Sequence, residues 1–167
     1  ELNNDSTEMF HFENSALKFV QHFKFGKDLI LKDISKIIGV NLETVKDILM
    51  NSNFSNDNLD TEIIEKKFFQ NNNFRKIKKK LIHDIAKARI QEIAEIVIFK
   101  NINILSLLNK NSTIFLRIQD FSNLKCFEKT FTEIFSDNNK FEFSFLENFS
   151  INEIYDSASK LVQYGWK

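Results

Sequence analysis

Acidic and hydroxyl side chains gather in the first seven residues, ELNNDST, where Glu1 and Asp5 are followed by Ser6 and Thr7. Another carboxylate, Asp120, lies in a second polar segment, RIQDFSNL. Carboxylates that converge can hold a divalent cation or perform general acid–base catalysis. Glu1, Asp5 and Asp120 are the candidates for such a cluster. Neither segment contains a glycine that would let backbone approach a ligand closely, and this argues against catalysis.

A basic run, FRKIKKK, occupies residues 74–80. Such a run could contact nucleic-acid phosphates or lipid head groups. However, the 23 basic and 23 acidic residues of the chain cancel, so no overall field attracts a polyanion. We interpret the run as the solvated start of a helix and expect no nucleic-acid partner. Its cations are Arg75, Lys76, Lys78, Lys79 and Lys80.

Arg89 and Glu92 stand three residues apart in KARIQEIAEIV, a segment with the apolar spacing of a helix. On a helix this spacing places both side chains on one face, where an ion pair contributes roughly 0.2–0.5 kcal/mol. We interpret the pair as ordinary helix packing, with a position at the lining of a cleft as the alternative.

The chain has one cysteine, Cys126, which excludes an internal disulfide and a cysteine metal cage. Cys126 lies in an apolar stretch, and we expect an unreactive core residue. The three histidines, His11, His22 and His83, lack the spacing of metal ligands. The sequence therefore predicts no metal site.

Composition limits the class of protein further. No apolar run approaches the roughly 20 residues of a membrane span, and no charged and then apolar leader opens the chain. We therefore expect a soluble, cytoplasmic protein. The chain has three glycines and no proline. This scarcity of glycine weakens the case for a loop that cradles phosphate.

The first part of the chain predicts a β-hairpin followed by two helices. Residues 7–12 and 16–24 are rich in apolar and aromatic side chains and are separated by a turn. A helical stripe then ends at Gly39, and Asn41 is a suitable N-cap for a second helix that reaches Met50. The stripe consists of Leu29, Ile30, Ile34, Ile37 and Ile38.

The rest of the chain predicts alternating elements. Residues 61–69 are expected to form a strand and 71–73 a loop. A long helix is expected from 74 to about 99, with residues that recur every three or four positions at Ile77, Leu81, Ile85, Ala88, Glu92 and Glu95. The remaining elements are a strand at 112–118, a helix at 123–135, a strand at 140–145 and a helix at 151–165. This order predicts an α/β fold with helices packed on a mixed sheet.

A hairpin that leads into alternating helices and strands resembles the ribonuclease H-like half-fold that actins and Hsp70 ATPases share. In such folds a small subdomain is inserted between the hairpin and the first long helix. The resemblance therefore implies an actin-like core subdomain formed by residues 1–26 and 74–167, and an inserted smaller subdomain formed by residues 27–73.

Four segments, in the same order, resemble the C-terminal half of the bacterial cell-division protein FtsA, an actin-like ATPase. Residues 87–97 resemble the family's helix ARxxEIxExV, and residues 25–49 resemble GGxxITxDIAxxLxVSxExAExxK. TEIF at 132–135 is similar to the helix before the last strand, and LVQYG at 161–165 is similar to the closing motif GLLLYG. In the second segment the matching residues are Gly26, Ile30, Asp33 and Ile34.

The resemblance implies a phosphate site at the N-terminal segment. Members of the family hold phosphate with an Asp-x-Gly turn that is followed by threonines. In this chain Glu1 stands for the aspartate and Asn3 for the glycine, while Ser6 and Thr7 stand for the threonines. The carboxylate and hydroxyl groups are kept in part, but the glycine that lets backbone amides approach phosphate is lost.

The positions that would contact adenosine are changed as well. Gln119, Asp120 and Phe121 replace the glycines of the family's Gly-rich turn, and we expect their side chains to fill the nucleotide space. The glutamate and lysine of the AExxK helix become Lys46 and Leu49, and the second glycine of the GG pair becomes Lys27. The sequence thus predicts a degenerate nucleotide site without a cofactor, with ATP and magnesium only if the site is retained.

The resemblance implies a cell-division scaffold that acts by protein–protein contact. Such a protein binds an FtsZ-like protein through residues 27–73 and assembles with actin-like subunits. It works at the inner face of the cell membrane at the division site and reaches the membrane only through a segment that is not in this chain. The candidate partner-binding residues are Asp28, Lys32, Asp33, Lys36 and Lys46.

Two other functions remain open. The first is an active actin-like ATPase that uses Glu1, Ser6 and Thr7 and would bind Mg-ATP measurably. The second is a nucleic-acid-binding module that uses the basic run at 75–80, whose affinity would fall steeply with salt.

Overall fold

The computed structural model describes residues 1–14, 16–52, 54, 59–69, 75–108, 112–137 and 140–146. The chain opens with the predicted hairpin, in which β1 (Thr7–Glu13) pairs antiparallel with β2 (Ala16–Phe23). The register shifts between His11 and Phe12, which marks a β-bulge. Thr7 and Met9 point into the core, and the hairpin prediction is confirmed.

The two helices that follow are confirmed, together with both predicted caps. Helix α1 (Asp28–Ile38) ends at Gly39, whose φ of 70° is the left-handed conformation that glycine adopts without strain. Helix α2 (Leu42–Asn51) begins at Asn41, whose side chain accepts a hydrogen bond of 2.8 Å from the Thr44 amide. Ile37, expected in the apolar stripe of α1, is 58% exposed.

The strand predicted at residues 61–69 is wrong. The segment makes a single antiparallel bridge, from Ile63 to Lys78, and then forms a short 3-10 helix, η1 (Lys66–Phe69). The buried side chains Ile64 and Phe69 anchor the segment. Their separation of five residues does not follow the two-residue repeat of a strand, so a turn buries both.

The long helix exists but begins later than predicted. Helix α3 spans Lys79–Ala94 and continues as a π-helical turn, η2 (Glu95–Phe99), whereas residues 75–78 lie before it and are not helical. The buried face also differs, because Leu81 is 44% exposed. The core-facing side chains of α3 are Ile82, Ala86, Ile90, Ile93 and Ala94. Apolar residues occur at several helical spacings in this segment. The sequence pattern alone therefore does not decide whether the stripe that contains Leu81 or the stripe that contains Ile82 faces the core.

The second sheet follows the long helix. Strand β3 (Thr113–Leu116) pairs in parallel with β4 (Glu142–Phe145). Between them lie a 3-10 segment, η3 (Phe121–Phe127), and α4 (Glu128–Phe135), so the predicted helix is present with a 3-10 first half. The helix predicted at 151–165 lies outside the described residues.

Leu2 connects the two sheets. It bridges antiparallel to Thr7, at the start of β1, and parallel to Ile118, just after β3. Its amide donates to the Arg117 carbonyl at 2.7 Å, and its own carbonyl accepts from the Gln119 amide at 3.0 Å. The lateral order is therefore β2, β1, the Leu2 segment, β3 and β4.

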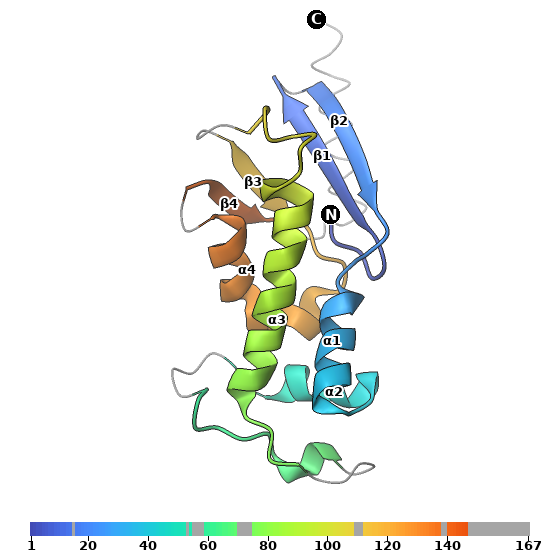
Figure 1. The fold of residues 1–167 in the computed structure, drawn as a ribbon, viewed down its shortest axis with the longest axis vertical. Helices are drawn as coiled ribbons and strands as arrows, with labels where there is room; N and C mark the ends of the chain where they lie inside the picture. The colour runs from blue at the N-terminus through green and yellow to red at the C-terminus, as the bar shows by residue number, and fades with distance from the viewer. Residues whose placement is uncertain are drawn as a thin grey trace, which may run out of the picture.

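Helix α3 runs along the long axis of the molecule and packs against α1 and against α4 (Figure 1). Buried side chains from the helices and from both sheets form one hydrophobic cluster. The fold is mixed α/β, as predicted. Figure 1 also shows that the N-terminal segment lies beside the start of α1, where the strands meet the helices.

Candidate functional site

The fold brings together the two segments that were expected to form the nucleotide site. The hydrogen bonds of Leu2 to Arg117 and Gln119 place the N-terminal turn beside the loop after β3. The carboxylate of Glu1 lies 3.8 Å from the Arg117 guanidinium, which adds an ion pair to this contact. Segments more than 110 residues apart in the sequence therefore meet at one joint.

Inside the N-terminal turn, the polar groups bond to the protein itself. The Asn3 amide donates to the Ser6 carbonyl at 2.9 Å, and the Asn3 side chain donates to the Ser6 hydroxyl at 3.4 Å. The hydroxyl of Thr7, a buried side chain, donates to the Phe25 carbonyl at 2.7 Å. These hydroxyl groups thus stabilise the turn and the connection to α1.

The start of α1 docks directly on this turn. The amides of Lys27 and Asp28 donate to the carbonyls of Asn3 and Asn4 at 2.8 and 2.9 Å. A Cβ atom at Gly26 would lie 2.3 Å from the Asn3 carbonyl oxygen, so only glycine permits this approach. A close backbone approach is therefore present, but its partner is the protein's own turn.

Lys27 occupies the centre of the joint. Its side chain is 2% exposed, and its Nζ donates to the Asp120 carbonyl at 3.4 Å. Burial lowers the pKa of Lys27, while the carboxylates of Asp28 and Asp120 oppose this effect and the positive charge of Lys46 adds to it. Asp120 itself has a φ of 46°, a left-handed conformation that aspartate adopts more readily than most residues.

The three residues expected to fill the nucleotide space lie differently. The side chains of Gln119 and Asp120 are exposed. Phe121 packs into the aromatic core, with its ring 5.1 Å from that of Phe145 and 6.0 Å from that of Phe131. The residue buried between the two segments is Lys27. The sequence signal for it was the replacement of the family's second glycine by a lysine.

Among the described residues, the three candidate carboxylates do not come together as a group. Asp5 is exposed. Within the described ranges, no three histidine, cysteine or acidic side chains are grouped so that they could hold a metal ion. Glu1, Asp5 and Asp120 therefore do not form the cluster that their residue types would allow.

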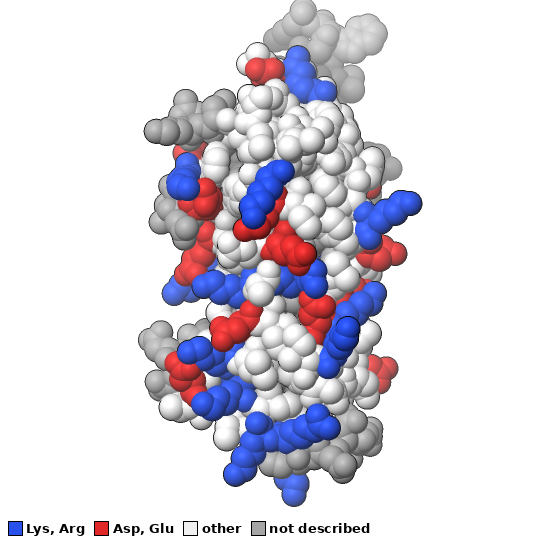
Figure 2. Space-filling model, viewed as in Figure 1, with Lys and Arg blue, Asp and Glu red and all other residues white. Residues whose placement is uncertain are grey.

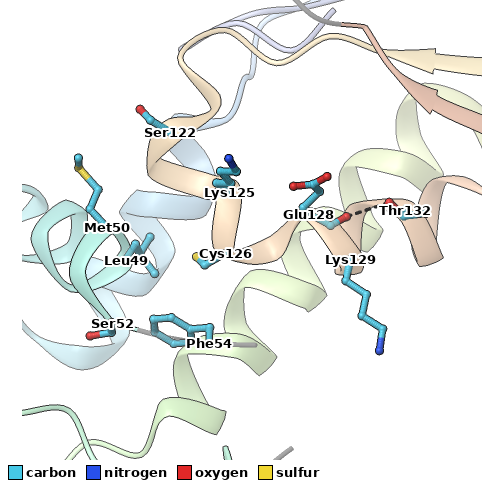
Figure 3. Close-up of a pocket in the computed structure, with 10 residues that line it drawn as sticks. All are labelled: Leu49, Met50, Ser52, Phe54, Ser122, Lys125, Cys126, Glu128, Lys129 and Thr132. Atoms are coloured by element: carbon cyan, nitrogen blue, oxygen red, sulfur yellow. Dashed lines mark hydrogen bonds between the residues drawn. The ribbon is translucent and has the colours of Figure 1, made fainter. Parts of the chain in front are cut away.

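A pocket of about 620 Å³ lies between α2 and the η3–α4 segment (Figure 3). Leu49, Phe54 and Cys126 approach one another on its floor, whereas Lys129 points away from it. Burial raises the pKa of the Cys126 thiol to about 12, so this cysteine is an unreactive packing residue at neutral pH. The full lining is Leu49, Met50, Ser52, Phe54, Ser122, Lys125, Cys126, Glu128, Lys129 and Thr132.

Arg89 has a role that the sequence did not predict. Besides its pair with Glu92, its guanidinium donates to the Asp33 carboxylate at 2.5 Å. The hydrogen bond to Asp33 raises the pKa of Arg89. Because Asp33 is on α1 and Arg89 is on α3, the pair joins two of the segments that carry the resemblance.

The other candidate partner-binding residues lie on the outer side of α1 and α2. Lys32, Lys36 and Lys46 are exposed, while Asp28 is half-buried at the joint. Asp33 is engaged by Arg89 and is half-buried. The three lysines are therefore the accessible members of the predicted set.

The basic run is partly neutralised. Lys79 pairs with Glu62 and Lys80 with Asp60, both at 2.6 Å. The guanidinium of Arg75 lies beside Gly39, where a Cβ atom added to the glycine would be 3.1 Å from one of its nitrogens. Gly39 follows the C-terminal end of α1, where a cation is favoured. Figure 2 shows basic side chains at the end of the molecule where α3 begins. Lys79 and Lys80 are thus paired within the fold, while Lys76 and Lys78 are exposed.

Comparison with known proteins gives no match among protein-family models, curated proteins or solved structures. Within the residues that the structure describes, no helix is both long enough and apolar enough to cross a bilayer.

Proposed function

We propose that this chain is part of a divergent FtsA-like cell-division scaffold that acts by protein–protein contact and has a degenerate nucleotide site. The strand order supports the fold on which this proposal depends. The described order, in which a hairpin is followed by the Leu2 segment and then by the parallel strands β3 and β4, is consistent with a ribonuclease H-like half-fold.

One observation carries the proposal: the joint between the N-terminal turn and the 119–121 loop is occupied by the chain itself. Lys27 is buried there, and the first amides of α1 bond to the turn. In the family a nucleotide links these segments, whereas here they are linked by hydrogen bonds within the protein. A domain of this kind keeps its shape without a ligand and can present α1 and α2 as a contact surface.

The outer lysines of α1 and α2 suit a partner segment with acidic groups. We expect the pair Lys32→Glu and Lys36→Glu to abolish binding to an FtsZ-like protein, measured by biolayer interferometry. Lys18→Glu, on exposed β2, is the matched charge reversal and should leave binding unchanged. Equal binding by both variants would remove α1 from the contact surface.

The second candidate is an active actin-like ATPase, and the pocket beside α2 favours it. The resemblance places the base-contacting helix at α2, and the pocket there has an apolar floor that could accept a purine ring. Lys27 would then contact phosphate once the joint opened.

Isothermal titration calorimetry with millimolar Mg-ATP distinguishes the two functions. The scaffold predicts no measurable heat for the wild-type protein. Micromolar binding that is lost in Lys27→Met would overturn the degenerate site and support the ATPase.

A further inference from the structure

The ammonium group of Lys27 is poorly compensated for a buried charge. An ammonium has three donor positions. In the described part of the chain, Nζ makes one hydrogen bond, of 3.4 Å, to the Asp120 carbonyl, and no carboxylate lies within 4.0 Å. The acidic groups that face it, Asp28 on α1 and Asp120 after β3, act only at longer range, and Lys46 on α2 repels it.

Burial of the Lys27 ammonium destabilises the closed joint. A charge removed from water without close partners destabilises the state that buries it. The lowered pKa of Lys27 has the same cause. If the turn and the loop separate from α1, the Lys27 ammonium is hydrated again. Opening the joint therefore recovers the free energy that is lost when this charge is removed from water.

We propose that Lys27 sets the joint to open: its buried charge lowers the free energy needed to separate the N-terminal turn and the 119–121 loop from the start of α1. The inference rests on the proposed function, because it concerns the cleft that the scaffold keeps closed. It makes that cleft a switch, closed at rest and opened at low cost by a partner that pulls on α1.

Two backbone hydrogen bonds report directly on opening. They are donated by the amides of Lys27 and Asp28 to the carbonyls of Asn3 and Asn4, and both cross from the start of α1 to the N-terminal turn. Hydrogen exchange of these amides, followed by NMR, measures the free energy of local opening. Amides in the middle of α3 serve as the internal reference for global unfolding.

Two uncharged variants test the cause. Lys27→Met keeps the length of the side chain, and Lys27→Gln keeps a polar group. If the buried charge drives opening, both variants slow exchange of the two amides about tenfold relative to the α3 reference, which corresponds to about 1.4 kcal/mol in the free energy of opening. Lys32→Met, on the exposed side of the same helix, should change nothing.

The opposite results overturn the inference. Unchanged exchange would mean that the charge is well accommodated, and faster exchange would mean that Lys27 holds the joint closed. Slowing in Lys27→Met alone would assign the effect to polarity rather than to charge. These measurements use no nucleotide, so their outcome is independent of the calorimetry that tests the proposed function.

Discussion

Lys27 is buried and Cys126 is half-buried, and the burial of these ionisable groups moves their pKa values in opposite directions because it favours the neutral form of each. For a lysine the neutral form is the deprotonated one, so its pKa falls. For a thiol it is the protonated one, so its pKa rises. Each shift makes the free energy of unfolding depend on pH in a window that the pKa values define.

Lys27→Met should remove one such dependence. Between the lowered pKa of folded Lys27 and the ordinary lysine pKa, the unfolded chain binds more protons than the folded chain, so stability rises with pH. Below that interval the cost of the buried charge is fully present. We therefore expect the variant to be more stable than the wild type at neutral pH, by a margin that narrows at alkaline pH. Urea unfolding across this range measures the margin, and a constant margin would contradict the assignment.

The thiol of Cys126 should be unreactive in the folded protein. With its pKa raised to about 12, it holds little thiolate at pH 8. We expect modification by a disulfide reagent to be at least about a hundredfold slower in the native protein than in urea, because each pKa unit lowers the thiolate fraction tenfold. Above the ordinary thiol pKa, ionisation favours the unfolded chain, so stability should fall there. Rapid native modification would show that the floor of the pocket is open.

At the scale of elements, the ends of the helices show which contacts can be predicted from sequence and which cannot. Apolar spacing and caps predicted α1 and α2 correctly, because Gly39 and Asn41 are local signals. Helix α3 begins later than the apolar spacing predicts, because Ile77 and Lys78 pair with Ile64 and Ile63 instead. A contact of that kind depends on a distant segment and leaves no trace in local periodicity.

Gly26→Ala should separate α1 from the N-terminal turn. The added Cβ would lie 2.3 Å from a backbone oxygen that cannot rotate away. We expect a loss of about 1–3 kcal/mol, the usual cost of overpacking, measured by urea unfolding. Lys32→Ala, also on α1 but exposed, is the control. A stability equal to the wild type would mean that the turn does not pack as described.

The pair between Asp33 and Arg89 should couple α1 to α3. Both side chains are 27% exposed, so solvent screens them in part. A double-mutant cycle with Asp33→Asn and Arg89→Gln is expected to give a coupling of about 1 kcal/mol. The same cycle with Glu92→Gln, whose side chain is 51% exposed, should give less. Equal couplings would mean that the contact between helices adds nothing beyond the contact within α3.

At the scale of the whole molecule, the mixed α/β class and most elements could be predicted from sequence. The joint could be predicted in outline, since its two segments were identified by resemblance, but its contents could not. The burial of Lys27 depends on Gly26, Asn3 and Asp120 together, and no spacing rule links these positions. Likewise, Asp33, the partner of Arg89 on α1, lies 56 residues away in the sequence.

The shared core predicts that the described helices unfold together. Side chains of α1, α2 and α3 belong to one cluster, although residues 27–73 were predicted to form a separate subdomain. We expect urea to release the slowest amides of α1, α2 and α3 in a single transition, followed by hydrogen exchange at increasing urea concentration. Release of α1 and α2 at clearly lower urea would instead support an independent inserted subdomain.

The connection through Leu2 has a mechanical consequence. The hairpin is held by a full ladder of paired residues and β3 by a ladder with β4, whereas the described backbone hydrogen bonds from the N-terminal segment to the chain after β3 all involve Leu2. Elements connected in series transmit the same force, and the link with the fewest bonds gives way first. A load applied between β2 and β4 should therefore part the molecule at Leu2 while both ladders remain intact.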